Sequence, residues 1–192
     1  MLSVAMLIMG VATPVTASPV KSSDETEAVS FPIVAKGLSG ASFTAVPAAD
    51  LTDPPGGGCT YNDITGNIHA QYLDGVLVTT ESEWSAKVLC TTTAPGQWMA
   101  AIQVTSTLWL NGVNIAQGAT FTCSACNLGN STGADICAGT QCAGTYWVSG
   151  AATLTLPTGW VWSTYPSECI SIAAAAIRCT AVSNTVTVLV SI

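Results

Sequence analysis

Apolar and polar residues alternate along much of this chain. Between positions 102 and 110 the even positions hold mainly Ile, Val and Leu, and the odd positions hold Gln, Thr and Trp. Because successive side chains of a β-strand point to opposite faces of a sheet, this period of two predicts a strand with one buried face. Similar stripes run from Tyr146 to Leu156 and from Val186 to Ile192. No stretch has a convincing helical period, and only the alanines at 173–176 are ambiguous.

Turn-forming dipeptides separate these stripes. Asn111-Gly112 and Asp74-Gly75 both tolerate the positive φ angles of a type I′ turn, so each predicts a tight β-hairpin. Many short strands joined by frequent turns are typical of sandwiches and barrels. We therefore expect an all-β, single-domain β-sandwich of the Ig-like or Greek-key kind, stapled by disulfides, with about seven to ten strands within residues 59–192.

The N-terminal residues 1–17 have the layout of a secretory signal peptide. An apolar run from Leu2 to Val11 is followed by Pro14, and Val15 and Ala17 are the small residues expected before a cleavage site. The run is shorter than the roughly 20 apolar residues that cross a bilayer. No basic residue precedes it, which leaves an uncleaved apolar N-terminus as the alternative. We expect cleavage after Ala17, secretion, and no membrane span in the mature chain.

Residues 18–58 are expected to form a leader that is mostly disordered. Their start is polar and charged, and 53–58 reads Asp-Pro-Pro-Gly-Gly-Gly, in which prolines without a backbone N–H precede flexible glycines. Between these parts, Phe31–Val34 can dock as one strand. The folded domain is therefore expected to begin at Cys59.

Eight cysteines, an even number, all lie from residue 59 onward. After a signal peptide, an even count predicts a disulfide framework formed in an oxidising compartment. Because antiparallel neighbours bring Cβ atoms within bonding distance, we expect one bond between early strands and one across a late hairpin. The expected pairs are Cys59 with Cys90 and Cys169 with Cys179, and Cys123, Cys126, Cys137 and Cys142 are expected to pair among themselves.

The Cys-rich segment 123–142 is dominated by small and turn-forming residues. Such a segment buries little apolar surface, so we expect a loop that its disulfides hold in order. Its spacing, Cys-x2-Cys followed by Cys-x4-Cys, is also close to that of a zinc site. Disulfide-bonded cysteines do not bind zinc as thiolates, so neither a metal nor a cofactor is expected.

Charged residues are few, and acids outnumber bases. The whole chain has 4 Lys and Arg against 11 Asp and Glu. From Cys59 onward Lys87 and Arg178 are the only bases, against six acids. Binding to nucleic acid or to anionic lipid needs a basic surface, so both kinds of partner are disfavoured. Weak repulsion between copies instead favours self-association or attachment to a surface.

Four short motifs follow one another between Cys59 and Trp162. They are Cys90-Thr91, Leu108-Trp-Leu-Asn-Gly112, Cys142-Ala-Gly-Thr-Tyr146 and Leu156-Pro-Thr-Gly-Trp160. In this order they resemble a group of small, uncharacterised, secreted β-proteins of actinobacteria that contain disulfides. The resemblance implies export and an all-β domain, and it implies no activity. The chain differs from this group by additional cysteines and by a further β segment that runs to its last residue.

Candidate catalytic residues are sparse. His69 is the only histidine, no Gly-x-Ser-x-Gly motif occurs, and His69 is expected on a strand facing water. Glu81 and Glu83 share one strand face, but the paired carboxylates of glycosidases normally come from separate elements across a cleft. We interpret these two acids as a solvated strand edge that blocks aggregation, and we do not expect an enzyme.

The six tryptophans offer the strongest functional hint. By the alternation of their strands, Trp109 and Trp147 fall on polar faces among threonines and serines, and Trp160 and Trp162 share one face. An exposed indole can stack on the apolar face of a sugar ring while neighbouring hydroxyls and amides form hydrogen bonds. These four are our candidate ligand-binding residues. The alternative is a second core layer beneath the Cys-rich segment.

The sequence therefore favours a secreted, non-catalytic module. Its expected partner is a polysaccharide or cell-wall surface, or further copies of the same chain. The alternative is a secreted inhibitor or effector that presents the loop 123–142 to a protein partner. A row of exposed tryptophans would favour the first function, and a rigid protruding disulfide loop would favour the second.

Overall fold

The computed structural model describes residues 26–36, 41–47, 57–92 and 99–192. These residues form thirteen β-strands, and their one helical element is a short 3₁₀ turn at Thr140–Cys142. The all-β prediction is confirmed, although the strands are more numerous than expected.

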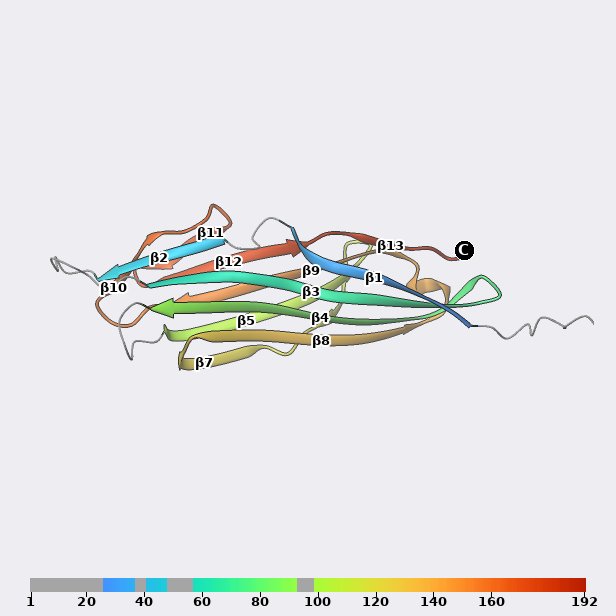
Figure 1. Ribbon diagram of the computed structural model, residues 1–192, viewed down its shortest axis with the longest axis horizontal. Coiled ribbons are helices and arrows are strands. Elements are labelled where there is room, and N and C mark those ends of the chain that lie inside the picture. Colours follow the sequence, from blue (N-terminus) through green and yellow to red (C-terminus); the bar gives the residue numbers. More distant parts are fainter. Residues whose placement is uncertain (1–25, 37–40, 48–56, 93–98) are drawn as a thin grey trace, which may run out of the picture.

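The strands form two antiparallel sheets that pack face to face as a sandwich (Figure 1). The strands of sheet A are β1 (Thr26–Lys36), β2 (Ala41–Pro47), β3 (Gly57–Leu73), β4 (Val76–Thr92), β8 (Leu128–Ala138) and β10 (Trp160–Thr164). The strands of sheet B are β5 (Met99–Leu110), β6 (Val113–Gln117), β7 (Phe121–Cys126), β9 (Gly144–Thr155), β11 (Cys169–Ala173), β12 (Ala176–Ser183) and β13 (Val186–Val188).

The order of the strands follows from their ladders. In sheet A, β8, β4 and β3 are neighbours, and the second side of β3 pairs with β1 along one part and with β2, followed by β10, along the other. In sheet B the order is β5–β9–β12–β11, with β6 and β7 beside β5 and β13 beside β9. The strands run along the long axis, so the sandwich is elongated (Figure 1).

One strand connects the two sheets. β1 pairs with β3 from Thr26 to Val34 and then with the end of β12 through Ala35 and Lys36. Next to this ladder, the Val34 backbone N–H donates to Asn184 Oδ1 at 2.7 Å. The sheets are therefore tied together by backbone pairing as well as by their shared core.

Both predicted type I′ turns are present. Asp74 and Gly75 have φ angles of 51° and 76°, and Asn111 and Gly112 have φ angles of 52° and 81°. These left-handed values match the twist of a two-residue hairpin, and Asn, Asp and Gly adopt them at low cost. The first turn joins β3 to β4, and the second joins β5 to β6.

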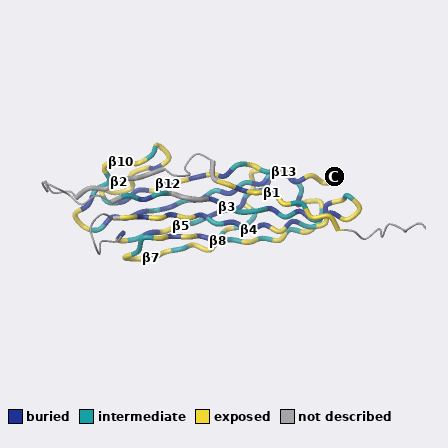
Figure 2. The backbone as a smooth tube through the Cα atoms, in the orientation of Figure 1, coloured by how far each residue is buried: buried dark blue, intermediate teal, exposed yellow. Residues whose placement is uncertain are grey.

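The core lies between the two sheets, and buried positions alternate with exposed ones along the strands (Figure 2). The apolar stripes predicted at 102–110 and 146–156 both face inward. The third stripe is only partly buried, because Val188 is 1% exposed whereas Ile192 is 57% exposed. The chain end runs along the tip of the β3–β4 hairpin, where Ile192 N–H donates to the Gly75 carbonyl at 3.0 Å.

The predicted disorder of the leader 18–58 is wrong for a large part of that range, because β1 and β2 lie within it. Phe31–Val34 does lie on a strand, as expected, and Ile33 is buried in the core. The physical reason is β3, whose 17 residues need hydrogen-bonding partners along both sides. The predicted signal peptide 1–17 and residues 53–56 of the predicted linker lie outside the described residues.

The Cys-rich segment 123–142 is not a loop, which corrects a second expectation. Most of it is β8, which pairs along its whole length with residues 79–89 of β4. Its glycines suggested turns, but some of them permit close packing instead. A Cβ atom on Gly129 would lie 2.6 Å from Ile102 Cγ2 of sheet B. Small residues therefore let β8 lie close to the opposite sheet.

The expected disulfide pairing is confirmed. Cys59–Cys90 and Cys169–Cys179 join residues that lie opposite each other in antiparallel ladders. In the Cys-rich segment the first cysteine pairs with the second and the third with the fourth. All eight cysteines are bonded, which fits an oxidising environment.

Candidate functional site

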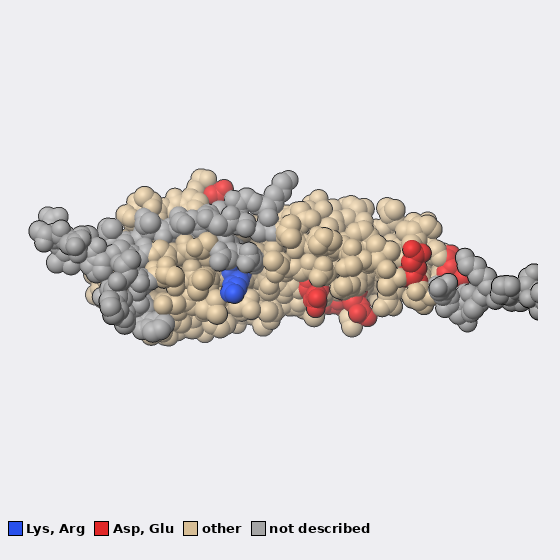
Figure 3. All heavy atoms as spheres, viewed as in Figure 1, with Lys and Arg blue, Asp and Glu red and all other residues tan. Residues whose placement is uncertain are grey.

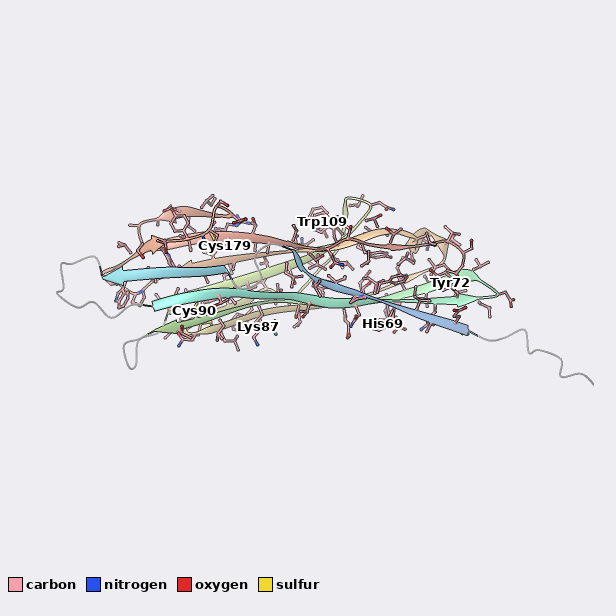
Figure 4. The ribbon with its side chains drawn as sticks, turned by 45° about the horizontal axis from the view of Figure 1, so that its top comes forward. His69, Tyr72, Lys87, Cys90, Trp109 and Cys179 are labelled. Atoms are coloured by element: carbon pink, nitrogen blue, oxygen red, sulfur yellow. A yellow bond between two sulfur atoms is a disulfide. The ribbon has the colours of Figure 1, made fainter. Side chains whose placement is uncertain are left out.

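The sandwich has two outer faces with different chemistry. Face A consists of the outward side chains of β1, β3, β4 and β8, and it includes His69 and Lys87. Face B consists of the outward side chains of β5, β9 and β12, and it includes Trp109. Figure 4 shows Trp109 on the opposite side of the molecule from His69 and Lys87.

Trp109 and Trp147 form a stacked pair on face B. They lie opposite each other in the β5–β9 ladder, with ring centroids 4.8 Å apart and an interplanar angle of 1°. Trp109 Nε1 donates to Ser149 Oγ at 2.8 Å, which fixes the orientation of that ring. Both tryptophans are half-buried, so their predicted place on the polar side of each strand is confirmed.

The geometry of the pair limits how a ligand can reach it. Two parallel indoles with centroids 4.8 Å apart overlap instead of lying side by side in one plane. Each ring therefore covers one face of its partner, so a ligand can contact only the other face or the edge of each ring. The pair is neither part of the core nor a coplanar platform.

The rest of face B is made of small polar side chains. In the β5–β9 ladder Thr107 lies opposite Ser149, and Thr105 lies opposite Ala151. Arg178 is the one charged residue among the outward positions of β5, β9 and β12. Face B thus offers hydroxyl groups at regular spacing with very little charge.

The other two candidate tryptophans do not join this pair. Trp160 is 9% exposed and belongs to the core, and Trp162 packs against it. They share one face of β10, as the alternation predicted, but that face points inward. Since β10 pairs with β2 at the end of sheet A, it lies away from the central strands of face B. The structure therefore separates the four candidates into two sites.

Face A carries a shallow depression that the sequence did not suggest. It has a volume of about 720 Å³ and crosses β1, β3, β4 and β8. Gly66 and Gly133 lie on either side of Trp84 in the ladders, and the Trp84 indole fills the space beneath Gly133. Polar side chains that line it include Asn67 and Ser85.

A second, smaller depression of about 190 Å³ is also lined by Glu83, and it contains His69 and Glu81. His69 lies directly opposite Glu81 in the β3–β4 ladder. The interpretation of Glu81 and Glu83 as a strand edge is wrong, because β8 pairs with the free side of β4 and places both acids within the sheet. These carboxylates are exposed and can accept hydrogen bonds from hydroxyl or amine groups.

Face A was missed because its members come from strands far apart in the chain. Asn67 meets Glu83 only through the β3–β4 register, and Ala134 joins them only because β8 is a strand. Across the described part of the chain, no group of three or more His, Cys, Asp or Glu is arranged to hold a metal ion. Few charged side chains are visible on the face drawn in Figure 3, and they are scattered.

The buried polar groups between the sheets bond to each other. Trp84 Nε1 donates to Ser106 Oγ at 3.0 Å, Ser106 Oγ lies 2.8 Å from Ser131 Oγ, and Ser131 donates to the Ala119 carbonyl. Burial raises the pKa of Tyr146, and its hydroxyl donates to the Cys142 carbonyl at 2.6 Å. These groups connect the sheets and are not available to a ligand.

Comparisons with known proteins give no information about function, so the function is inferred from the two faces. No protein-family model matches the chain, no curated protein is detectably similar to it, and no solved structure matches it. Within the residues that the structure describes, no helix is long and apolar enough to cross a membrane.

Proposed function

We propose that the protein is a secreted, non-catalytic module that binds an extended, uncharged polysaccharide, such as a cell-wall glycan, through face B. The observation that carries this proposal is the stacked pair of Trp109 and Trp147 at the surface of a sheet face with almost no charge. The four disulfides support an extracellular setting, because such bonds persist in oxidising compartments.

The tryptophan pair suits a sugar because an indole is apolar and flat. The ring face turned away from its partner and the ring edge can contact the C–H groups of a pyranose, while nearby Thr107 and Asn114 offer hydrogen bonds. The bond between Trp109 Nε1 and Ser149 holds the ring in place before a ligand arrives. A preorganised ring loses little conformational entropy on binding.

The regular rows of face B favour a polymer over a small molecule. Neighbouring strands lie about 4.8 Å apart, and alternate residues along one strand lie about 6.7 Å apart. The hydroxyls of Thr105, Thr107, Ser149 and Thr153 follow this lattice across two strands. Repeated hydroxyls without charge match a neutral ligand that is itself repetitive.

The alternative function, an inhibitor that presents the Cys-rich segment to a protein partner, assumed that this segment is a protruding loop. Most of that segment is β8, whose backbone hydrogen bonds are used within sheet A. Self-association through face B remains the competing use of the same surface, since two flat faces with few charges repel each other weakly. The experiment has to separate these two uses.

The test is retention of the purified protein on insoluble polysaccharides and cell-wall preparations. We expect Trp109→Ala and Trp147→Ala each to weaken binding by about 1–3 kcal/mol, as truncation of an interface aromatic does. The matched controls are Asn67→Ala and Glu83→Gln on face A, which should bind like the parent protein.

Two outcomes would contradict the proposal. Loss of binding in the face A variants alone would move the glycan site to the other side of the sandwich. Failure to bind any glycan, together with a dimer in sedimentation that Trp109→Ala dissociates, would make face B a self-association surface.

A further inference from the structure

The four disulfides differ in how well they are shielded. Both residues of Cys59–Cys90 and of Cys169–Cys179 are buried, and so is Cys142 of the third bond. In the Cys123–Cys126 bond, neither cysteine is buried. A thiol from solution therefore meets least obstruction at Cys123–Cys126.

The Cys123–Cys126 bond also closes the smallest loop. Its sequence separation is 3, against 31 for Cys59–Cys90. In the chain-entropy model, a disulfide stabilises a fold less when the loop that it closes is shorter. Opening this bond is therefore expected to release little of the constraint that the disulfides place on the unfolded chain.

The surroundings of the bond do not depend on it. β7, which carries both cysteines, lies at the outer edge of the sandwich, where it pairs with β5 (Figure 1). The next residue, Asn127, accepts a hydrogen bond from the Cys90 N–H at 2.7 Å. β8 is then held by its full ladder with β4. The backbone partners on both sides of the disulfide loop do not involve the S–S bond, so we expect them to remain when it opens.

The backbone within the disulfide loop is itself strained. Ala125 has a φ of 51°, in the left-handed region that residues with a Cβ atom adopt at a cost. Ala125 lies inside the loop that the Cys123–Cys126 bond closes. Opening the bond removes one restraint on this residue, which favours the reduced form of this pair.

The chemistry of exchange favours the same bond. A thiolate attacks one sulfur of a disulfide, and the other sulfur leaves as a thiolate. At Cys137–Cys142 attack on the more accessible sulfur would expel a thiolate at the buried Cys142, where low polarity disfavours the charge. At Cys123–Cys126 either leaving thiolate forms on a half-buried residue that packs against the core, where water reaches it more easily than it reaches Cys142.

We propose that Cys123–Cys126 is a thiol–disulfide exchange site that reacts with small extracellular thiols while the other three disulfides stay closed. One thiol, as its thiolate, attacks Sγ of Cys123 or Cys126, breaks the S–S bond and forms a mixed disulfide, and the displaced sulfur takes up a proton. A second thiol cleaves the mixed disulfide. Two thiols are then joined as one external disulfide, and the protein pair has gained two electrons and two protons. This activity is independent of the proposed glycan binding.

The first test uses the full-length oxidised protein and reduced glutathione as the probe. Samples are equilibrated over a range of glutathione concentrations, alkylated, and mapped by mass spectrometry, with far-UV circular dichroism in parallel. We expect Cys123 and Cys126 to become labelled together at a glutathione concentration at least about ten-fold lower than any other cysteine, with an unchanged β-sheet signal. Labelling of another pair at the same concentration, or loss of the sheet signal in step with labelling, would overturn the proposal.

The second test traps the mixed disulfide. In Cys126→Ser the remaining Cys123 thiol should form an adduct with oxidised glutathione, whereas the matched variant Cys137→Ser leaves the buried Cys142 thiol, which should not. An unreactive Cys123 thiol in folded Cys126→Ser would overturn the proposal. If Cys137→Ser does not fold, the wild-type titration still decides, because it needs no variant.

Discussion

Two tryptophan sites in this protein use the same hydrogen bond in opposite settings. Between the sheets, Trp84 donates its indole N–H to Ser106 at 3.0 Å, and on face B, Trp109 donates to Ser149 at 2.8 Å. Trp84 is 3% exposed, whereas Trp109 is half-buried. Water can replace the serine at the surface but not in the interior. Similar contacts should therefore differ in what their loss costs.

Two glycines on the strands beside β4 allow close packing around Trp84 at the interior site. A Cβ atom on Gly133 would lie 2.2 Å from Trp84 Cζ2, whereas one on Gly66 would lie 2.3 Å from the backbone carbonyl oxygen of Glu83. Gly133 thus leaves room for the large ring, and Gly66 lets the backbones of β3 and β4 lie close together. On face B the room for Trp109 is open to solvent, and its neighbour is a second ring. The interior site is built by packing, and the surface site by cross-strand pairing.

The largest expected difference in stability is that between truncation of the interior ring, Trp84, and truncation of the surface ring, Trp109. Trp84→Ala removes a buried indole and leaves a cavity, so the free energy of unfolding should fall by about 3–5 kcal/mol. Trp109→Ala removes a stacked surface pair and should cost only about 1 kcal/mol. Guanidinium unfolding of both variants with intact disulfides measures the difference. Equal losses would mean that the Trp109–Trp147 pair is core.

A smaller effect is expected when only the interior acceptor is removed. Ser106→Ala leaves Trp84 Nε1 without its partner and takes a neighbour from Ser131, both inside the sandwich. Leaving a buried donor unpaired costs about 1–3 kcal/mol. Thr107→Ala, which removes a hydroxyl from the outward side of the same strand, is the control. The idea fails if Ser106→Ala unfolds at the same denaturant concentration as the parent.

The two settings also occur on consecutive residues, because Tyr146 is buried between the sheets and Trp147 lies on face B. Burial raises the pKa of Tyr146 above its ordinary value of 10.0, an effect that Asp135 adds to and the hydrogen bond with Thr80 opposes. The folded state therefore holds the phenol proton more tightly than the unfolded state. This contribution to stability is complete below pH 10.0 and is lost as the pH rises through the raised pKa of the folded state.

Tyr146→Phe should remove this alkaline loss of stability. At neutral pH the variant should also lose about 1 kcal/mol, because the hydrogen bond to the Cys142 carbonyl disappears. The control is Tyr165→Phe, since Tyr165 is 39% exposed. Unfolding free energies measured from neutral to alkaline pH decide the matter. A slope that Tyr146→Phe leaves intact would assign the effect to another group.

The smallest effect is expected at the surface acceptor. Ser149→Ala removes the partner of Trp109 Nε1, but water can reach the half-buried ring, so stability should change by no more than about 0.5 kcal/mol. The near-UV circular dichroism of the stacked indoles should change, because the ring loses one restraint. A loss as large as that of Ser106→Ala would remove the distinction between the two sites.

Local features of the fold could be predicted because they depend on neighbouring residues. The positive φ angles at Asp74-Gly75 and Asn111-Gly112 follow from the residue types alone. The division of each strand into an apolar and a polar side follows from the alternation of side chains along it. The disulfide between Cys169 and Cys179 could be inferred because a short hairpin brings its ends together.

Features that depend on pairing between distant segments could not be predicted. The polar start of β1 resembles a linker until β3 offers it a ladder. The small residues of β8 resemble a loop until β4 pairs with them and the Trp84 ring fills the space beneath Gly133. For the same reason Glu83 looked like part of a strand edge, although it lies within a sheet and beside a depression.

The tryptophans show which features the sequence predicts and which depend on the tertiary structure. By itself it determined that Trp109 and Trp147 lie on the polar sides of their strands and that Trp160 and Trp162 share a face, because alternation is a property of one strand. Only the tertiary structure decided that the first two stack on each other, since their contact depends on the register between β5 and β9. It also decided that the face shared by Trp160 points into the core. A strand pattern defines two faces, but which face is buried depends on where the second sheet packs.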